Sequence, residues 1–283
     1  MDTQPAPGQP ILATMREEHL DAAYALSSAE RWPQRREDWA FALSLGRGTV
    51  ALEGSRVVGT TIWWAYGPSL ALFGMVVVDP AFRGRKIARR LMEKAMAEAG
   101  SRVGALVATD DGLPLYERLG FRETDRIHQH RGTASIVARP PGIRAVGRSE
   151  DITDVLALDG DASGGDRSAV IAALRNVGKL VIVEQAGRIA GYTVIRRFGL
   201  GQVIGPVVAR DRENAQALIT AGLSDLAGSL VRIDVPESAG LGDWLTTLGL
   251  GRVGGGIAMA RGSIATPARS GAHLFALASQ ALG

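Results

Sequence analysis

The chain has no cysteine among its 283 residues. Disulfides, thiolate zinc sites and a cysteine nucleophile are therefore excluded. Lysine is nearly absent as well, because only Lys86, Lys94 and Lys179 are lysines among 32 cationic residues. No basic run carries interleaved aromatic residues, so we expect no nucleic-acid partner. No apolar run approaches the ~18 residues that a membrane span requires, so we expect no membrane partner either.

The chain also has little net charge, and its first ten residues do not have the pattern of a signal peptide. Its formal net charge is +3, and 46% hydrophobic with 22% charged residues is typical of a globular protein. The stretch MDTQPAPGQP, residues 1–10, lacks the charged segment and apolar core of a signal peptide. We expect residues 1–10 to be a disordered tail and the protein to be cytoplasmic.

One order of predicted elements occurs twice along the chain. Residues 11–138 predict two helices, a hairpin, a strand, a helix, a strand, a short helix and further strands. A Pro-Pro pair within residues 139–142 cannot lie in a helix or central strand, so this stretch predicts a linker. The order then recurs in residues 143–262. Residues 263–283 predict a C-terminal segment with a helix at HLFALASQALG.

The two halves also correspond in local sequence. GSRVVGTTIWWAYG parallels AGRIAGYTVIRRFG, FGMVVV parallels IGPVVA, and LYERLGF parallels WLTTLGL. An ordered series of matches over this distance indicates an internal repeat.

The junction VVVDPAFRGRKIARRLM, residues 76–92, predicts a strand, a tight turn and a helix. The first N–H groups of a helix lack intrahelical acceptors, and the helix dipole adds partial positive charge there. Gly84 allows close backbone approach, while Arg83, Arg85 and Lys86 add full charges. Cations oppose the dipole at this end, so their presence favours a bound phosphate or diphosphate. The alternative is a surface helix whose first turn is simply basic.

Neither of two nucleotide-binding fingerprints fits, but another motif does. The chain has no P-loop motif, and no Gly-x-Gly-x-x-Gly follows a strand. Residues 76–92 resemble motif A of the GNAT superfamily of N-acetyltransferases, Val-x-Pro-x-x-Gln/Arg-x-x-Gly-x-Gly/Ala. Val78, Pro80, Arg83 and Ala88 match this motif, and Lys86 stands where the family usually has glycine. The stretch LPLYERLGF is similar to motif B, and the resemblance covers the whole first half.

The resemblance implies an α/β fold (α+β, mixed sheet) of two tandem GNAT-like domains, each a central mixed β-sheet flanked by helices. It implies acetyl-CoA as co-substrate and no metal. The pantetheine arm would pair with the backbone of one strand, and the diphosphate would bind the amides of the following turn. The residues so assigned are Val76, Val77, Val78, Arg83, Gly84, Arg85, Lys86, Ile87 and Ala88.

The resemblance further implies an N-acetyltransferase that transfers acetyl directly to a small-molecule amine. Tyr116 matches the family's general acid; alternatively it packs beneath the cofactor. A backbone N–H near Val76 is a candidate oxyanion donor. The general base stays open between the Asp110–Asp111 pair and water. Large aromatic residues near the implied acceptor pocket are substrate-contact or core candidates: Trp32, Trp39, Trp63 and Trp64.

The second half resembles a degenerate GNAT domain, as in two-domain acetyltransferases of the YitH type. It lacks the Arg-Gly-Arg-Lys turn, and Leu245 falls where Tyr116 lies in the first half. We therefore expect this copy not to bind CoA by the same means. DGDASGGDRSAV, residues 159–170, is either an acceptor-lining stretch or a helix-capping loop.

Two other functions remain open from the sequence. One is a non-catalytic acyl-CoA-binding or regulatory module, and the other an acyltransferase for a hydroxyl or a protein N-terminus. His128 and His130 share a strand face but have no apparent third metal ligand. The acceptor and the oligomeric state are unknown at this stage.

Overall fold

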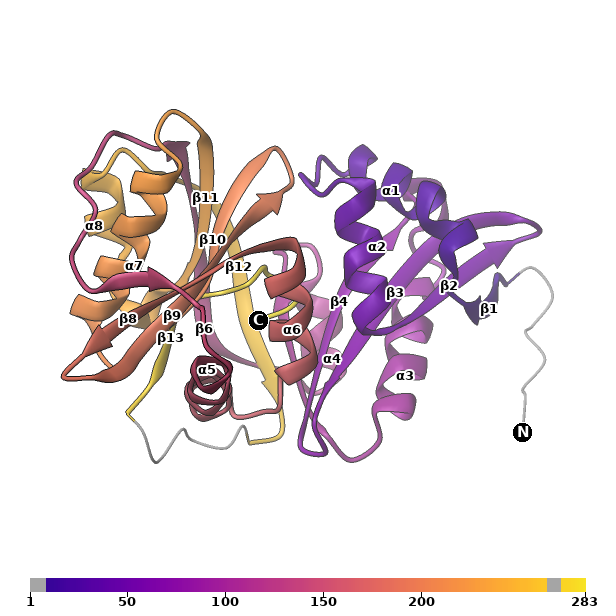
Figure 1. Ribbon diagram of the computed structural model, residues 1–283. Helices are drawn as coiled ribbons and strands as arrows, with labels where there is room; N and C mark the ends of the chain where they lie inside the picture. The colour runs from indigo at the N-terminus through magenta and orange to yellow at the C-terminus, as the bar shows by residue number, and fades with distance from the viewer. Residues whose placement is uncertain (1–8, 264–270) are drawn as a thin grey trace. The chain divides into compact units, whose positions relative to one another are not determined.

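The computed structural model describes residues 9–263 and 271–283. The chain divides into two compact units, Met1–Gly104 and Ala105–Gly283 (Figure 1). Most of the predicted tail, residues 1–8, lies outside the described residues, and β1 begins at Ile11.

The first unit is built on four antiparallel strands in chain order. The strands are β1 Ile11–Thr14, β2 Arg47–Glu53, β3 Arg56–Tyr66 and β4 Leu70–Val78. A Gly-Ser turn joins β2 to β3, with Gly54 at φ +60°, a conformation that glycine adopts without steric cost. The hairpin predicted from the sequence is therefore confirmed.

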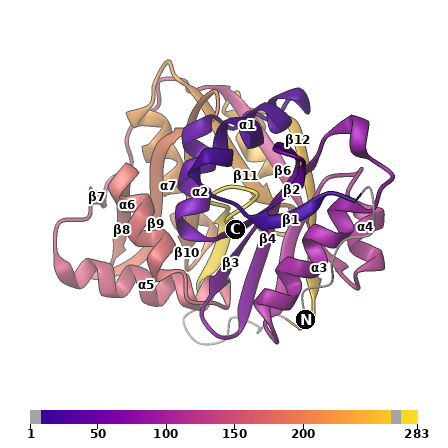
Figure 2. The ribbon, with the colours of Figure 1, turned by 90° about the vertical axis from the view of Figure 1, so that its right-hand side faces the viewer.

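Helices cover both faces of this first sheet (Figure 2). They are α1 Leu20–Ala29, α2 Arg36–Leu45 and α3 Ile87–Ala99, with short 3₁₀ turns η1 Glu17–His19 and η2 Pro80–Phe82. Adjacent residues of β3 reach opposite helices, as strand alternation requires. The Trp64 indole donates to the Ala42 carbonyl of α2, and the Trp63 indole donates to Glu98 of α3.

The second unit contains a larger mixed sheet in the order β12-β6-β11-β10-β9-β8-β7. β10 and β11 are parallel, whereas β6 is antiparallel to both β11 and β12. The strands are β6 Arg122–Thr133, β7 Ile143–Ala145, β8 Gly178–Gln185, β9 Arg188–Phe198, β10 Gly201–Ala209, β11 Leu230–Pro236, β12 Gly251–Arg261 and β13 His273–Ala276. Another strand, β5 Val103–Ala108, crosses the boundary between the units.

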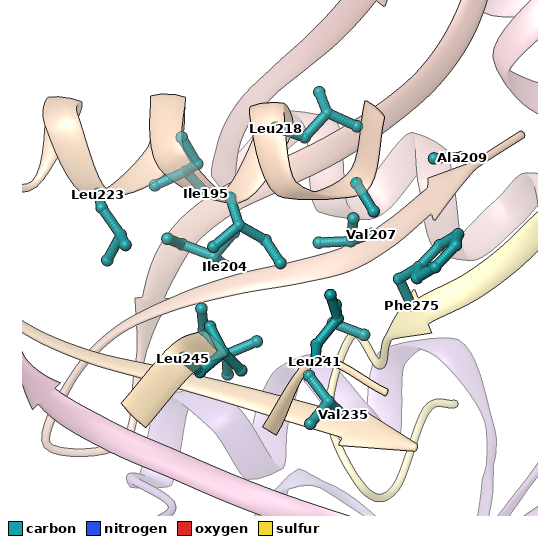
Figure 3. Close-up of a cluster of buried hydrophobic side chains, with 14 of the residues drawn as sticks. Ile195, Ile204, Val207, Ala209, Leu218, Leu223, Val235, Leu241, Leu245 and Phe275 are labelled. Carbon is teal, nitrogen blue, oxygen red and sulfur yellow. The ribbon is translucent and has the colours of Figure 1, made fainter. Parts of the chain in front are cut away.

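The helices of the second unit are α4 Leu113–Arg118, α5 Ser149–Ser163, α6 Ser168–Val177, α7 Arg212–Asp225 and α8 Gly242–Thr247, with the 3₁₀ turn η3 Glu237–Ala239. Apolar residues of α7, β9 and β10 pack into one core with Leu241 and Leu245 (Figure 3). Leu245, the counterpart of Tyr116, has no exposed surface.

The structure confirms the repeat. β3 and β9 are each 11 residues long and have the same burial pattern, and β4 and β10 are each 9 residues long. The compact units do not coincide with the repeats. β6 belongs to the predicted first domain, 11–138, yet pairs on both sides with strands of the second. The domain limits, including linker 139–142 and domain 143–262, stay predictions about the repeats.

The predicted C-terminal helix is wrong. Within residues 271–283 the chain forms β13, His273–Ala276, antiparallel to β10, and residues 264–270 lie outside the described residues. A helix of this length is marginal on its own in water. Strand pairing with β10 and burial of Phe275 therefore override the local helical pattern.

Candidate functional site

A bulge interrupts β4 directly before the predicted site. Ile62 of β3 pairs with Gly74 and Thr60 pairs with Val77, so Met75 and Val76 together oppose Thr61. Met75 has φ +54°, and its carbonyl accepts a 2.7 Å hydrogen bond from the Thr60 hydroxyl. A bulge leaves one residue outside the regular ladder and redirects the backbone. The predicted oxyanion donor near Val76 thus lies at an irregularity of the strand.

The sequence reasoning missed this bulge, although a signal was available. Glycine inside a strand often marks a bulge. Gly74 in FGMVVV and Gly205 in IGPVVA occupy matching positions, and both lie at register shifts. The conformation of Met75 itself has no signature in the sequence.

The turn after β4 is fixed by Asp79. Its carboxylate accepts a 2.9 Å hydrogen bond from the Ala81 N–H, and it pairs with Arg56. Its own N–H donates to the Val58 carbonyl of β3, 3.0 Å away. The Asp-Pro step therefore holds the entry to the turn with its side chain and its backbone.

The N-terminus of α3 has no internal cap. Lys86 occupies the N-cap position and makes no side-chain capping hydrogen bond, and the first turn contains no acid. In the described part of the chain, the amides from Gly84 to Arg89 donate to no backbone or side-chain acceptor. A run of free amides at a helix N-terminus can donate hydrogen bonds to a bound anion.

The turn before α3 is exposed and cationic. Residues 83–86 are exposed, and Gly84 at φ +78° has nothing within 4 Å of where a Cβ would lie. Arg83 pairs with Glu30, and the Arg85 guanidinium lies 4.8 Å from the Phe82 ring centroid. Lys86 has φ +60° and ψ +18°, the left-handed conformation that favours glycine. Lys86 thus holds a backbone conformation that glycine would adopt without steric cost.

The remaining cofactor candidates lie in or beside the core. The Ile87 side chain is 2% exposed and packs with Val58 and Leu91 in a small core cluster. Val77 is also buried, whereas Val76 and Val78 are half-buried on the alternate face of β4. This packing fixes the strand and the first helical turn around the free amides.

Tyr116 lies in α4 of the second unit. Its ring meets Phe121 edge to face, with centroids 6.2 Å apart. Burial raises the pKa of Tyr116 to about 12, so the phenol stays protonated at neutral pH. No hydrogen-bond partner of its hydroxyl occurs in the described residues. Its role as general acid stays a prediction.

The tryptophans serve mainly as packing groups. Trp39, Trp63 and Trp64 are at most 3% exposed, and the Trp39 indole donates to the Ser27 hydroxyl. With their indole N–H groups used inside the fold, these three offer a ligand almost no surface. Trp32, half-buried after α1, keeps the predicted acceptor-site role.

The other sequence candidates form no metal centre. The His130 ring Nδ1 lies 2.9 Å from the Leu250 carbonyl, and burial and Arg252 lower the pKa of His128. Across residues 9–263 and 271–283, no group of three His, Cys, Asp or Glu side chains could hold a metal ion. No helix in those ranges has the length and apolar character to cross a membrane.

The second copy closes the corresponding helix N-terminus. The helix α7 begins after Asp211, whose carboxylate accepts a 2.8 Å hydrogen bond from the Asn214 N–H. Its first turn also carries Glu213. An internal carboxylate thus occupies the position that α3 leaves free, in agreement with the expected loss of anion binding in this copy.

Each half matches a family model described as an acetyltransferase (GNAT) domain. One model matches residues 44–123, and a second model matches residues 155–276. The chain is 27% identical to the uncharacterized N-acetyltransferase YitH of Bacillus subtilis, over 96% of this chain and 98% of that protein.

Solved structures agree in fold. A putative acetyltransferase from Pyrococcus horikoshii has a TM-score of 0.84 at 19% identity, over 100% of this chain and 99% of that one. A tandem GNAT protein from the clavulanic acid biosynthesis pathway has a TM-score of 0.62 at 17% identity, over 88% of this chain and 97% of that one.

Proposed function

Since the chain belongs to the GNAT acetyltransferase family, as a tandem protein of the YitH type, we propose that it transfers acetyl from acetyl-CoA to the amine of a small molecule. One CoA site lies in the first copy, and the second copy has no equivalent site.

The open N-terminus of α3 carries this proposal. A diphosphate accepts hydrogen bonds from the free amides between Gly84 and Arg89. Its negative charge also offsets the unfavourable placement of Arg85 and Lys86 at the positive end of the helix dipole. The bare left-handed turn at Gly84 lets the phosphate oxygens reach the backbone. Residue types and backbone shape fit the same ligand.

The acyl-bearing arm extends along β4 in this proposal. Residues Val76 to Val78 supply backbone hydrogen-bonding groups, and the bulge at Met75 and Val76 interrupts the regular ladder where the donor is proposed. Such a preorganised donor stabilises negative charge that develops on the thioester oxygen as the amine nitrogen attacks the carbonyl carbon. The C–S bond then breaks and the sulfur leaves as a thiolate.

Tyr116 is assigned to the leaving sulfur by its motif match. With its pKa raised to about 12, the phenol is a weaker acid than free tyrosine, but it remains a hydrogen-bond donor throughout the physiological range. We infer that it stabilises the thiolate by donating this hydrogen bond, and the proton lost by the amine balances the product thiol.

Calorimetry with CoA tests the site. We expect one CoA per chain, weaker binding for Arg85→Ala, and unchanged binding for Lys94→Ala. Lys94 is a matched control because it is a cation further along the same helix, paired with Glu98. Absence of CoA binding by the intact chain, or equal effects of the two variants, would contradict the proposed site.

Turnover separates an enzyme from a non-catalytic CoA-binding module. We expect CoA release with at least one class among amino acids, polyamines, aminoglycosides and peptides. Tyr116→Phe should lower turnover about 10²–10³-fold, the range for loss of one preorganised hydrogen-bond donor, while CoA affinity stays the same. Full turnover in this variant would remove Tyr116 from the mechanism.

A further inference from the structure

β10 and β11 of the second unit are neighbours at one end only. They pair in parallel at Gln202 with Val231 and at Val203 with Arg232. From Val207 onward, β10 pairs instead with the antiparallel strand β13. Residues 273–283 thus enter the space where two parallel strands separate. This C-terminal segment, distinct from the N-terminal residues 1–10, is called the tail from here on.

The gap is shaped by a bulge at Gly205 and Pro206, which together oppose Val194 of β9. Proline has no N–H for a ladder hydrogen bond, so the regular pairing of β10 cannot continue through it. A Cβ on Gly205 would lie 2.1 Å from the Leu277 carbonyl oxygen. Only glycine therefore admits the tail backbone at this distance.

The tail is hydrogen-bonded to both sides of the gap. The Leu277 N–H donates to the Asp234 carbonyl of β11 at 2.8 Å. From β9, the Arg196 guanidinium donates to the Ala278 carbonyl at 2.9 Å. The tail thus satisfies a backbone carbonyl of β11 that faces the gap, and it accepts a hydrogen bond from the Arg196 side chain.

Apolar side chains add a specific contact. Phe275 is 7% exposed and lies beside Val207 and Ala209, close to Leu241 and Val235 (Figure 3). Most of the following residues are buried as well. An aromatic ring in a core pocket gives this segment a sequence requirement that backbone pairing alone does not.

A buried charged network holds the far end of the tail. Arg167 donates to the Gly283 carbonyl oxygen at 2.8 Å and pairs with Asp159, which also accepts from the Tyr192 hydroxyl. The Arg167 and Asp159 side chains are at most 2% exposed. Both belong to residues 159–170, so that stretch forms part of a binding network rather than only a capping loop.

We propose that the gap between β10 and β11 is a peptide-binding site whose ligand is the chain's own tail, bound as an added strand. This mode combines main-chain hydrogen bonds with pockets for selected side chains. If the CoA arm lies at the matching bulge of the first copy, as in the proposed function, the tail occupies the place of a second arm. The peptide site itself does not depend on that function.

A cleavable full-length chain tests the site. A protease recognition sequence inserted between Gly262 and Ser263 is cut after folding. A fluorescein-labelled peptide of residues 271–283 is then added, and its binding is followed by anisotropy. We expect the cut tail to stay with the protein through gel filtration and to exchange with the labelled peptide at one site per chain.

Peptide variants supply the matched comparison without altering the protein. A Phe275→Ala peptide should bind about 100-fold more weakly or worse, as for removal of a buried ring. A His273→Tyr peptide, changed at an exposed position but with a ring kept beside Phe275, should bind like the parent. Equal binding of both peptides would overturn the proposal, as would loss of the tail from a cut protein that keeps its circular dichroism.

Hydrogen exchange on the uncut chain covers the case in which cutting unfolds the protein. The amides of Leu277, Ala278 and Leu282 have internal acceptors and should be strongly protected. Exchange at free-peptide rates would overturn the proposal. Neither readout involves CoA, so failure of the peptide site and failure of the proposed acetyl transfer are distinguishable.

Discussion

Replacing Lys86 with glycine is expected to stabilise the fold and to weaken CoA binding at the same time. Lys86 is held at φ +60°, where an L-residue costs about 1–2 kcal/mol. Glycine removes that cost but loses about 0.5–1 kcal/mol more backbone entropy on folding. The free energy of unfolding should therefore rise by about 0.5–1 kcal/mol from conformation alone.

Charge adds a second, separable effect. Removing a cation from the N-terminus of α3 relieves about 0.3–1 kcal/mol of unfavourable interaction with the helix dipole. The same cation, exposed on the turn, should contribute about 0.5–1 kcal/mol to diphosphate binding, a factor of about 2–5 in affinity. This factor should shrink in concentrated salt because exposed charges are screened.

Lys86→Ala is the matched control, since it removes the charge but keeps a Cβ in the left-handed conformation. Urea unfolding should find the glycine variant about 0.5–1 kcal/mol more stable than the alanine variant. Calorimetry at low salt should show that both variants bind CoA more weakly than the parent chain, by the same factor. Equal stability of the two variants would refute the left-handed assignment, and unchanged low-salt affinity would refute the role of the ammonium group.

Three further outcomes are expected. Asp211→Ala should lower the free energy of unfolding by about 1 kcal/mol through loss of the α7 cap, with CoA affinity unchanged by calorimetry. Because the folded state raises the Tyr116 pKa to about 12, stability should fall as pH rises from about 10 to about 12, by about 2 kcal/mol in urea titrations, and Tyr116→Phe should flatten that fall. Gly205→Ala should force the tail away from β10, seen as faster exchange of the Leu277 amide; unchanged exchange would contradict the close approach.

Much of the fold followed from local sequence signals. The Gly-Ser hairpin, the strand–turn–helix junction and the repeat depend on periodicity and turn residues within a few positions, and the structure confirms all three. The cluster Arg83–Lys86 was recognisable because residue types at a helix start carry electrostatic meaning on their own.

The features that could not be predicted depend on partners distant in the chain. HLFALASQALG has a helical pattern, and only its pairing with β10 makes residues 273–276 a strand. Trp63 and Trp64 are adjacent and equally aromatic, and only helices on both faces of β3 bury both. The bulge at Met75 likewise requires β3 opposite it.

The two copies differ in which group satisfies the same unpaired backbone hydrogen-bonding groups. A helix N-terminus leaves donors unsatisfied, and parallel strands that separate leave a row of backbone groups without a neighbour. The second copy meets both needs internally, with Asp211 before α7 and the tail beside β10. At α3 the first copy leaves the donors free and adds cations around them. Under the proposed function, a diphosphate completes the donors at α3, whereas Asp211 completes those at α7 on the same fold.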